Sequence, residues 1–465
     1  MSKQTSTQSE SGGITRRNFL SGSIAAAATI SIVPRHVLGG AGYKAPSDTL
    51  NIAAVGVGGK GRSDITSVSS ENIVALCDVD DDKMRDSLRR IKKEEKYQKL
   101  YQQMEAAPKY RDFRQMLEKE KSIDAITVST PDHTHTVVAV MAMRMGKHVF
   151  VQKPLTHSVK EARILREVAQ ETGVITQMGN QGHADEGGRL VCEWIWDGAI
   201  GPVREVYCWT NRPVWDTGMD RPKEIPSARP SLDWDLWLGP APWRPYHPAY
   251  VPWSWRAWCD FGTGALGDMG AHIFDHAYWP LKLEYPTKVH AYSTQFNGES
   301  WPVAEVFYYE FPARGEMPPV KLTWLDGGLM PPRPAEMEPG RKMGDDDGGV
   351  LFIGDKGLLM CGCYGRNPRI IPETKMKAYK RPEKTIPRSP GIHEEWVEAI
   401  KKGTRSTTDF AYSSKLVETM MLGNIAIRMA HKNMVLEYDG EKGEITNLPE
   451  ANEFLIREYR DGWKF

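Results

Sequence analysis

The sequence predicts an α/β protein that begins with a doubly wound parallel sheet and continues into half-buried antiparallel strands. An apolar run over residues 50–55 ends in a glycine-rich turn. Short apolar runs then alternate with helical patterns as far as residue 155, which is typical of a parallel sheet with crossover helices. Further along, apolar and polar residues alternate over 304–314 and 320–328, which predicts strands with one buried face.

The composition narrows the class of protein. With 465 residues the chain is long enough for two or three domains. Its 60 basic and 60 acidic side chains balance, so nothing indicates a nucleic acid or an acidic lipid surface as partner. The 6 cysteines do not form paired C-x-x-C sets, which argues against a zinc ribbon or a disulfide framework.

The N-terminal segment has the pattern of an export signal. Arg16 and Arg17 precede a mildly apolar run that is too short to span a bilayer. This pattern predicts a twin-arginine signal, with signal and linker over residues 1–42, no membrane span in the mature chain, and a periplasmic or cell-envelope location. That route exports folded proteins and therefore suits a protein that carries a tightly bound cofactor.

The glycine-rich turn after the first strand fits the pattern G-x-G-x-x-G. The first glycine permits a tight turn, the second lets the backbone approach a pyrophosphate, and the third lets helix and strand pack closely. The phosphate would lie at the N-terminus of the next helix, where free N–H groups favour anions. We therefore predict a dinucleotide cofactor on this turn, bound by Gly56, Gly58, Gly59 and Gly61.

An aspartate at the end of the next strand bears on the choice of cofactor. Asp78 lies 17 residues after Gly61. A carboxylate there accepts hydrogen bonds from the ribose hydroxyls and repels a 2′-phosphate. Asp80, Asp81 and Asp82 add negative charge. The sequence therefore predicts NAD in preference to NADP.

Two later segments place polar residues at the carboxyl ends of strands, where ligands of open α/β sheets bind. The loop T-P-D-H-T-H contributes Thr130, Pro131 and His135. The segment H-V-F-V-Q-K-P ends another strand with Lys153. We expect Lys153 to emerge on the cofactor side of the sheet.

Together these motifs resemble the Gfo/Idh/MocA family of oxidoreductases. The resemblance rests on the glycine turn, the T-P-x-x-x-H loop, and G-K-H-V…K-P over residues 146–154, and it extends over the chain from residue 48. It implies a Rossmann domain followed by an α/β domain with a large, mainly antiparallel sheet. The family usually has glutamate before the lysine, whereas this chain has Gln152.

We expect the NAD-binding domain over residues 48–170 and the substrate-binding, catalytic domain over residues 171–465. The strands of the second domain are also candidates for pairing with a second subunit, which would give a homo-oligomer.

A glycine-rich helix start over residues 262–279 carries the candidate catalytic pair. Asp268 and His272 are four residues apart and share a helix face. The resemblance implies that Lys153 and His272 flank the reacting hydroxyl near the nicotinamide. Oxidising a secondary alcohol sends a hydride to the nicotinamide while a base removes the hydroxyl proton. We expect His272 as base, Lys153 as electrostatic partner and Asp268 as orienting group; a desolvated Lys153 is the alternative base.

The same helix offers a metal-binding alternative. His272, Asp275 and His276 have H-x-x-D-H spacing, which is similar to an inverted zinc-protease motif. Such motifs have glutamate where this chain has aspartate, and the sequence shows no obvious third ligand. We therefore expect no metal.

Candidate substrate contacts come from two further stretches. Asn180 and His183 follow a predicted strand, and polar loop residues without such a role are the alternative. Residues 232–264 are too rich in proline for regular structure, and a long ordered loop is usually functional, which makes Arg256 and Trp258 candidates. Residues 194–279 hold 11 of the 15 tryptophans, which suits a wall for sugar faces, a core or a subunit interface.

The leading hypothesis is an exported NAD-dependent oxidoreductase that oxidises a ring hydroxyl of a carbohydrate, either a sugar or a glycoside. A rival is an NAD-dependent glycosidase, which oxidises C3 transiently, eliminates the aglycone, adds water and reduces the product. A third hypothesis is a cofactor-bound sugar-binding protein without turnover.

Overall fold

The computed structural model describes residues 48–464, and the expected export signal lies outside this range. A single compact unit begins at Leu50 and contains every element named below. Among the described helices, none combines the length and the apolar character that crossing a membrane requires.

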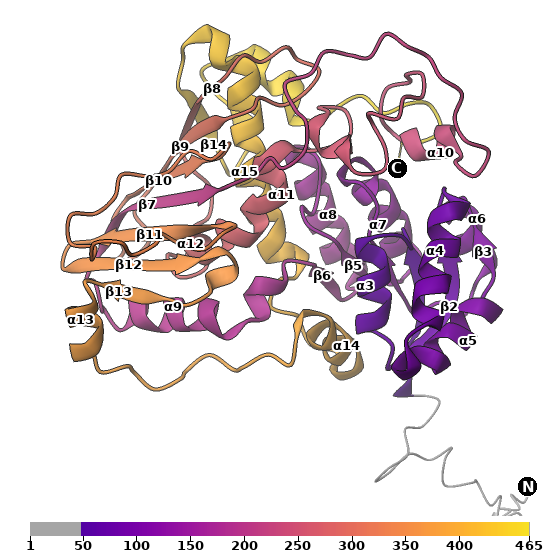
Figure 1. Ribbon diagram of the computed structural model, residues 1–465, viewed down its shortest axis with the longest axis horizontal. Helices are drawn as coiled ribbons and strands as arrows, with labels where there is room; N and C mark the ends of the chain where they lie inside the picture. The colour runs from indigo at the N-terminus through magenta and orange to yellow at the C-terminus, as the bar shows by residue number, and fades with distance from the viewer. Residues whose placement is uncertain (1–47, 465) are drawn as a thin grey trace, which may run out of the picture. The chain divides into compact units, whose positions relative to one another are not determined.

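A six-stranded parallel sheet forms the N-terminal part, as the alternating pattern predicts (Figure 1). Its strand order, β3-β2-β1-β4-β5-β6, reverses direction between β1 and β4, which is where ligands bind in such sheets. The strands are β1 (Asn51–Val55), β2 (Asn72–Cys77), β3 (Lys109–Tyr110), β4 (Ala125–Val128), β5 (His148–Val151) and β6 (Thr176–Met178).

Helices cover both faces of this sheet, so its central strands are apolar on both sides. Alternate residues of β1 divide between two clusters: Ile52 packs with α3, α4 and α5, and Ala53 packs with α6, α7 and α8. A helix from late in the chain, α14 (Ile392–Lys402), adds Trp396 to the first cluster. The other helices are α3 (Lys60–Ser67), α4 (Asp81–Lys92), α5 (Gln98–Ala106), α6 (Phe113–Lys119), α7 (His135–Arg144) and α8 (Val159–Thr172).

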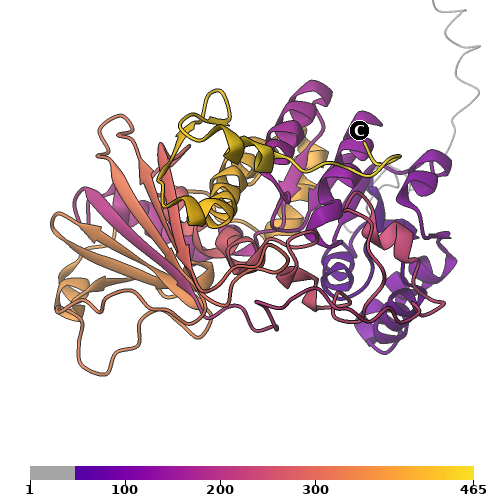
Figure 2. The same cartoon turned by 90° about the horizontal axis from the view of Figure 1, so that it is seen from above.

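A nine-stranded sheet forms the second part, and all its neighbours are antiparallel except β7 and β10 (Figure 2). The expected large, mainly antiparallel sheet is thus confirmed. Its order is β13-β12-β11-β7-β10-β9-β8-β14-β15. The strands are β7 (Val203–Thr210), β8 (Lys288–Ser293), β9 (Glu305–Phe311), β10 (Val320–Leu325), β11 (Gly348–Gly354), β12 (Gly357–Gly362), β13 (Arg369–Ile371), β14 (Leu436–Asp439) and β15 (Glu444–Ile445).

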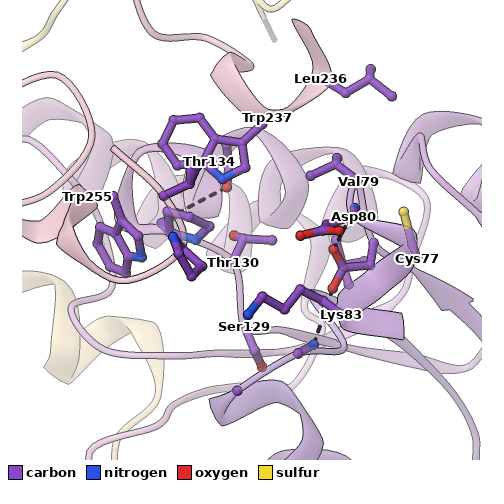
Figure 3. A pocket seen from close by; sticks show the side chains of 18 of the residues that line it. Cys77, Val79, Asp80, Lys83, Ser129, Thr130, Thr134, Leu236, Trp237 and Trp255 are labelled. Carbon is purple, nitrogen blue, oxygen red and sulfur yellow. Dashed lines mark hydrogen bonds between the residues drawn. The ribbon is translucent and has the colours of Figure 1, made fainter. Parts of the chain in front are cut away.

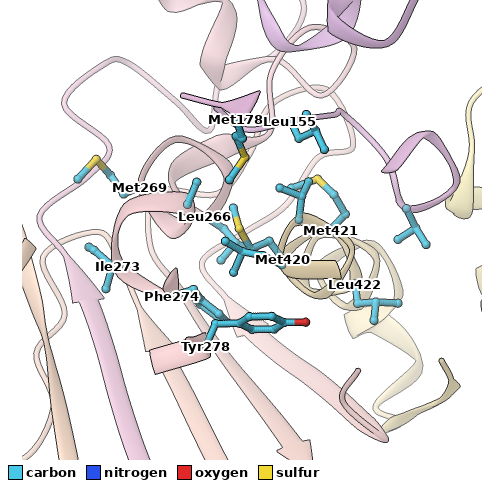
Figure 4. Packing of buried hydrophobic residues seen from close by; sticks show 14 of the residues in the cluster. Leu155, Met178, Leu266, Met269, Ile273, Phe274, Tyr278, Met420, Met421 and Leu422 are labelled. Atoms are coloured by element: carbon cyan, nitrogen blue, oxygen red, sulfur yellow. The ribbon is translucent and has the colours of Figure 1, made fainter. Parts of the chain in front are cut away.

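Helices on one face of the second sheet join it to the parallel sheet through a continuous apolar core (Figure 4). The long helix α15 (Phe410–Met429) packs against α8, against β8 and against α11 (Gly264–Ile273). Within this core Leu155 and Met178 lie near Met420 and Leu266. The packing fixes α11 beside the carboxyl ends of β5 and β6. The remaining helices are α9 (Glu186–Trp196), α10 (Trp234–Leu238), α12 (Asp275–Tyr278) and α13 (Glu373–Ala378).

A long excursion over residues 211–261 leaves the second sheet after β7 and reaches the parallel sheet. It is mostly irregular, as its proline content predicts, and it builds its own aromatic core from Trp215, Trp237 and Trp258 among others. It forms a bridge with the loop after β2, where Asp80 pairs with Leu232. We call residues 211–261 the insert; it covers part of the carboxyl edge of the parallel sheet.

Candidate active site

A cavity of about 340 Å³ lies at the carboxyl edge of the parallel sheet (Figure 3). Its floor comes from the glycine turn and from the loops after β2, β4 and β5. Its cover comes from the insert, including Trp237, Trp253 and Trp255, and from Trp463 near the C-terminus. The cavity is therefore enclosed by three segments that are distant in sequence.

The glycine turn has the close backbone approach that dinucleotide binding requires. Gly56 has φ of 80°, and a Cβ atom at Gly61 would lie 1.9 Å from the Gly56 carbonyl oxygen. Gly56, Gly58 and Gly59 line the cavity, and Gly61 begins the packing of α3 beneath it. The turn therefore fits a dinucleotide, because any larger residue at position 61 would displace it.

Asp78 lines the cavity and also fixes the glycine turn. Its Oδ2 accepts hydrogen bonds from the backbone N–H groups of Val57 at 2.8 Å and Gly58 at 3.2 Å, and its Oδ1 accepts one from Asp80 at 3.0 Å. Burial raises the pKa of Asp78 to about 6, against these hydrogen bonds. Lys83, Arg111 and Arg229 line the same cavity, so this end holds charges of both signs.

The T-P-D-H-T-H loop contributes Thr130 and Pro131 to the cavity wall, whereas His135 lies behind it. The His135 ring nitrogens lie 2.9 Å from the Thr130 carbonyl oxygen and 2.8 Å from that of Pro154. His135 therefore links this loop to the turn that carries Lys153, which is a positioning role.

Lys153 lines the cavity and meets Asp268 from α11. Its Nζ donates to Asp268 Oδ1 at 2.9 Å and to the Asp268 carbonyl oxygen at 2.5 Å. Arg256 Nε donates to the same Oδ1 at 3.1 Å. Burial alone would raise the pKa of Asp268, but the charges of Lys153 and Arg256 outweigh it and hold that pKa below its usual range. Asp268 is therefore ionised and orients both cations.

Arg256 belongs to the cavity wall together with two aromatic rings. Its guanidinium carbon lies 4.5 Å from the ring centroid of Trp253 and 4.2 Å from that of Trp255. These contacts hold the guanidinium beside the two tryptophan rings of the insert at the cavity wall.

His272 lies one turn after Asp268 on α11. No hydrogen bond joins these two side chains within residues 48–464, and both cations bind Asp268 through its Oδ1. His272 is buried, and burial together with the charge of Lys153 lowers its pKa well below the usual value, so the imidazole is neutral at neutral pH. Its ring packs 4.6 Å from that of Tyr364. His272 does not contribute to the lining of the 340 Å³ cavity.

Two residues of this region were not among the site residues predicted from the sequence. Tyr364 has φ of 62°, which a residue with a side chain rarely adopts, and this places its ring on His272. Asp132 lies in the T-P-D-H-T-H loop and lines the cavity beside Lys153. Sequence reasoning used this loop for its Thr, Pro and His and passed over its carboxylate.

The remaining substrate candidates lie outside the cavity lining. Trp258 is buried in the insert and donates Nε1–H to the Ala249 carbonyl oxygen at 3.0 Å. His183 Nδ1 lies 2.9 Å from Asp275 Oδ2, and its ring stacks on Trp279 with centroids 4.0 Å apart. Asn180 is buried on the same turn. None of the three lines the 340 Å³ cavity. Trp258 and His183 are engaged by the contacts above, whereas neither polar atom of the buried Asn180 amide has a hydrogen-bond partner within residues 48–464.

The metal-binding alternative finds no support in the part of the chain that the structure describes. Asp275 is engaged by His183 and by the Tyr412 hydroxyl at 2.6 Å. Within residues 48–464 no three His, Cys, Asp or Glu side chains converge in a way that would hold a metal ion.

Gln152 takes part in a buried network centred on Asp64 of α3. Its Nε2 donates to both Asp64 carboxylate oxygens, at 3.0 and 2.9 Å. Asp64 also accepts from Lys60 Nζ and Ser129 Oγ, each at 2.7 Å, and lies 3.0 Å from His393 Nε2. Asp64 therefore supplies a carboxylate within hydrogen-bond distance of position 152, and the Gln152 amide is its donor.

Comparison with known proteins places two segments in one family. Residues 50–180 match the oxidoreductase family with an NAD-binding Rossmann fold designated GFO_IDH_MocA, and residues 204–301 match the C-terminal alpha/beta domain of the same oxidoreductase family.

Curated relatives match over short stretches. Scyllo-inositol 2-dehydrogenase (NAD(+)) of Bacillus subtilis (strain 168) is 33% identical over 110 residues, 24% of this chain and 29% of the relative. Levoglucosan dehydrogenase of Pseudarthrobacter phenanthrenivorans is 24% identical over 167 residues, 36% of this chain and 35% of the relative. A glycosyl hydrolase family 109 protein of Solibacter usitatus is 31% identical over 141 residues, 29% of this chain and 31% of the relative. The chain thus matches about a third of the length of these relatives.

Solved structures share the fold over most of their length. The levoglucosan dehydrogenase complex with NADH superposes with a TM-score of 0.54 at 15% identity, covering 84% of this chain and 99% of that one. GenD2 from gentamicin A biosynthesis, in complex with NAD, gives a TM-score of 0.55 at 20% identity, covering 88% and 100%.

The Asp64 network gives a reciprocal test. Gln152→Glu places a second carboxylate about 3 Å from Asp64 in a buried site, and we expect it to lower the free energy of unfolding by about 2 kcal/mol or more. The double variant Asp64→Asn/Gln152→Glu restores a single carboxylate and should recover at least half of that loss. Urea denaturation at pH 7 measures both; a double variant with the sum of the two single losses contradicts the assignment.

Proposed function

Because the chain belongs to the Gfo/Idh/MocA family of oxidoreductases, we propose that it is an NAD-dependent enzyme that oxidises a ring hydroxyl of a sugar or glycoside. The observation that carries this proposal is the meeting of Lys153, Arg256 and Asp268 at one wall of the cavity whose floor is the glycine turn. A fixed positive group there lies where an alcohol would become an alkoxide.

The residues present fit a dinucleotide. Gly56, Gly58 and Gly59 line the cavity without side chains, so a pyrophosphate can approach the backbone closely there, and Lys60 lies beside them. Asp78 and Asp80 offer carboxylates for ribose hydroxyls. When bound, NAD supplies a hydride acceptor. We favour NAD over NADP because of Asp78, although Lys83 and Arg229 place positive charge near the same end.

Residues of the chain would stabilise the developing charge, accept the proton and contact the sugar ring. The Lys153 ammonium, held by Asp268, stabilises negative charge on the substrate oxygen. For the hydroxyl proton we propose the neutral imidazole of His272 as acceptor, one helical turn after Asp268 although outside the cavity lining, with the cavity-lining Lys153 as the alternative. Trp237 and Trp255 on the cavity wall suit the apolar faces of a sugar ring. Names of relatives such as scyllo-inositol 2-dehydrogenase and levoglucosan dehydrogenase support a polyhydroxylated ring as substrate.

We also propose that the mature protein acts outside the cytoplasm and pairs with a second copy. The arginine pair at residues 16–17 supports export. The open face of the nine-stranded sheet supports pairing, because Tyr292 and Tyr308 are 62% and 36% exposed there and lie on neighbouring strands.

Lys153→Ala and His272→Ala test the catalytic assignment. Each removes a group that acts in the transition state, so we expect kcat to fall at least about 100-fold with a sugar or glycoside that the wild-type protein oxidises. NADH absorbance measures the rate. Lys160→Ala, on the exposed side of α8, and His431→Ala are matched controls that should keep wild-type rates. Unchanged rates in both Lys153→Ala and His272→Ala would count against the proposed site.

Because the insert covers the cavity, we expect the protein to release bound NAD slowly. Arg229 in the insert pairs with Asp80, so the insert holds the loop after β2 closed. We expect protein purified without added cofactor to carry bound NAD, and Arg229→Ala to speed its loss at least about 10-fold. The control is Arg221→Ala, because Arg221 also lies in the insert and forms an ion pair with Glu299 outside it. Native mass spectrometry after timed dialysis measures occupancy; equal loss from all three proteins contradicts the prediction.

A further inference from the structure

Asp132 is a buried carboxylate of the cavity wall that the mechanism above leaves unused. It follows Pro131 directly, is 3% exposed, and lines the cavity together with Lys153 and Arg256. Its Oδ2 accepts hydrogen bonds from the Thr263 N–H at 3.2 Å and the Thr263 hydroxyl at 2.7 Å. Within residues 48–464 it forms no ion pair within 4.0 Å, although the cavity contains several cations.

Folding alone gives little reason for an acid at this position. Burying a carboxylate without an ion pair is costly, and an asparagine oxygen would accept the Thr263 hydrogen bonds equally well. A costly titratable group inside a ligand cavity is more often functional than structural.

The charges around Asp132 come from three different elements. Lys153 at the end of β5 and Arg256 in the insert attract its negative form, and Asp268 on α11 repels it. Burial is the largest influence and raises the pKa of Asp132 to about 7, against the Thr263 hydrogen bond and the two cations. Near neutral pH the group therefore exchanges readily between acid and base.

We propose that Asp132 is a second acid–base group of this site, which removes and returns the proton on the ring carbon next to the oxidised one. This inference rests on the proposed function, because only a ketone makes that proton acidic. After hydride transfer, the C–H bond breaks and its proton goes to the Asp132 carboxylate. The electron pair moves onto the ketone oxygen, where the Lys153 ammonium stabilises the enolate.

The reverse step balances the sequence. The carboxylic acid of Asp132 returns the proton to the carbon and the ketone reforms. Return of the hydride to the carbonyl carbon would then give the starting alcohol, with the proton held by His272, or by Lys153, going back to its oxygen. The ring carbon on the far side of the deprotonated carbon can bear an oxygen substituent. In that case the electron pair of the enolate can instead expel this substituent, and a proton from water goes to the departing oxygen. Two separate proton acceptors thus favour the redox-neutral glycosidase as the second candidate function.

Two simpler roles for Asp132 predict different outcomes. If Asp132 only positions Thr263 at the start of α11, then Asp132→Asn and Thr263→Val should lower hydride transfer and carbon exchange together. If Asp132 only accepts a hydrogen bond from the cofactor, then Asp132→Asn should lower cofactor retention, and the ratio of the two rates should stay constant.

The experiment uses the purified holoenzyme in D₂O with a panel of methyl and 4-nitrophenyl glycosides. For the wild-type protein we expect transient NADH in a single turnover and deuterium on one ring carbon of the recovered glycoside, read by NMR and mass spectrometry. For Asp132→Asn we expect the ratio of exchange to NADH formation to fall at least about 100-fold. Thr263→Val, which leaves the carboxylate in place, should change this ratio less than about 10-fold.

A pH profile of the wild-type protein tests the same inference without a variant. The base form of Asp132 is required, so exchange should rise as pH increases through about 7 and level off above it. A profile that is flat between pH 5 and 9 would overturn the assignment.

The outcomes separate the two proposals. NADH formation without deuterium exchange overturns the role of Asp132 and leaves the proposed oxidation standing. If Asp132→Asn keeps the wild-type ratio of deuterium exchange to NADH formation, the role of Asp132 is likewise overturned and the proposed oxidation stands. Absence of NADH formation with every glycoside overturns the proposed function, and the inference about Asp132 falls with it.

Discussion

The site depends on one carboxylate shared by two cations. Asp268 of α11 accepts hydrogen bonds from Lys153 at the end of β5 and from Arg256 in the insert, so three separate segments meet at a single oxygen atom. The Lys153 and Arg256 cations face two carboxyl groups at this wall, the ionised Asp268 and the partly ionised Asp132. Because Asp268 holds the Lys153 ammonium, that ammonium is fixed before any substrate arrives, which is what stabilisation of a developing alkoxide requires.

Those parts of the structure that follow local rules could be predicted from the sequence. The glycine turn, the strand ends at Asp78 and Lys153, and the parallel sheet follow from short periodic patterns and from turns with few alternatives. The family resemblance implied that Lys153 and His272 flank one reacting hydroxyl; the contact of Lys153 with Asp268, 115 positions along the chain, follows from no local pattern. Asp268 was expected beside His272; its engagement by two cations instead reflects the stronger attraction of full charges in a buried site.

Long-range polar packing could not be predicted in the same way. Gln152 lies 88 positions from Asp64, and His393 lies 329 positions from it. A change from glutamate to glutamine at position 152 reads as a lost charge in the sequence, whereas in three dimensions Asp64 carries that charge. Trp258 and His183 raise a related difficulty: residue type shows that an aromatic or imidazole group is present, and only the fold shows whether it faces a cavity or a core.

A single physical cause gives the cavity region two groups of opposite character. Burial disfavours charge, so it lowers the pKa of His272 and raises the pKa of Asp132 to about 7. The histidine is therefore held in its basic form and the aspartate is held near the midpoint between acid and base. When neighbouring titratable groups are shifted apart in this way, each suits a different proton transfer. The insert covers the cavity that Asp132 lines, whereas His272 is buried outside that lining, so burial acts on the two groups in different surroundings.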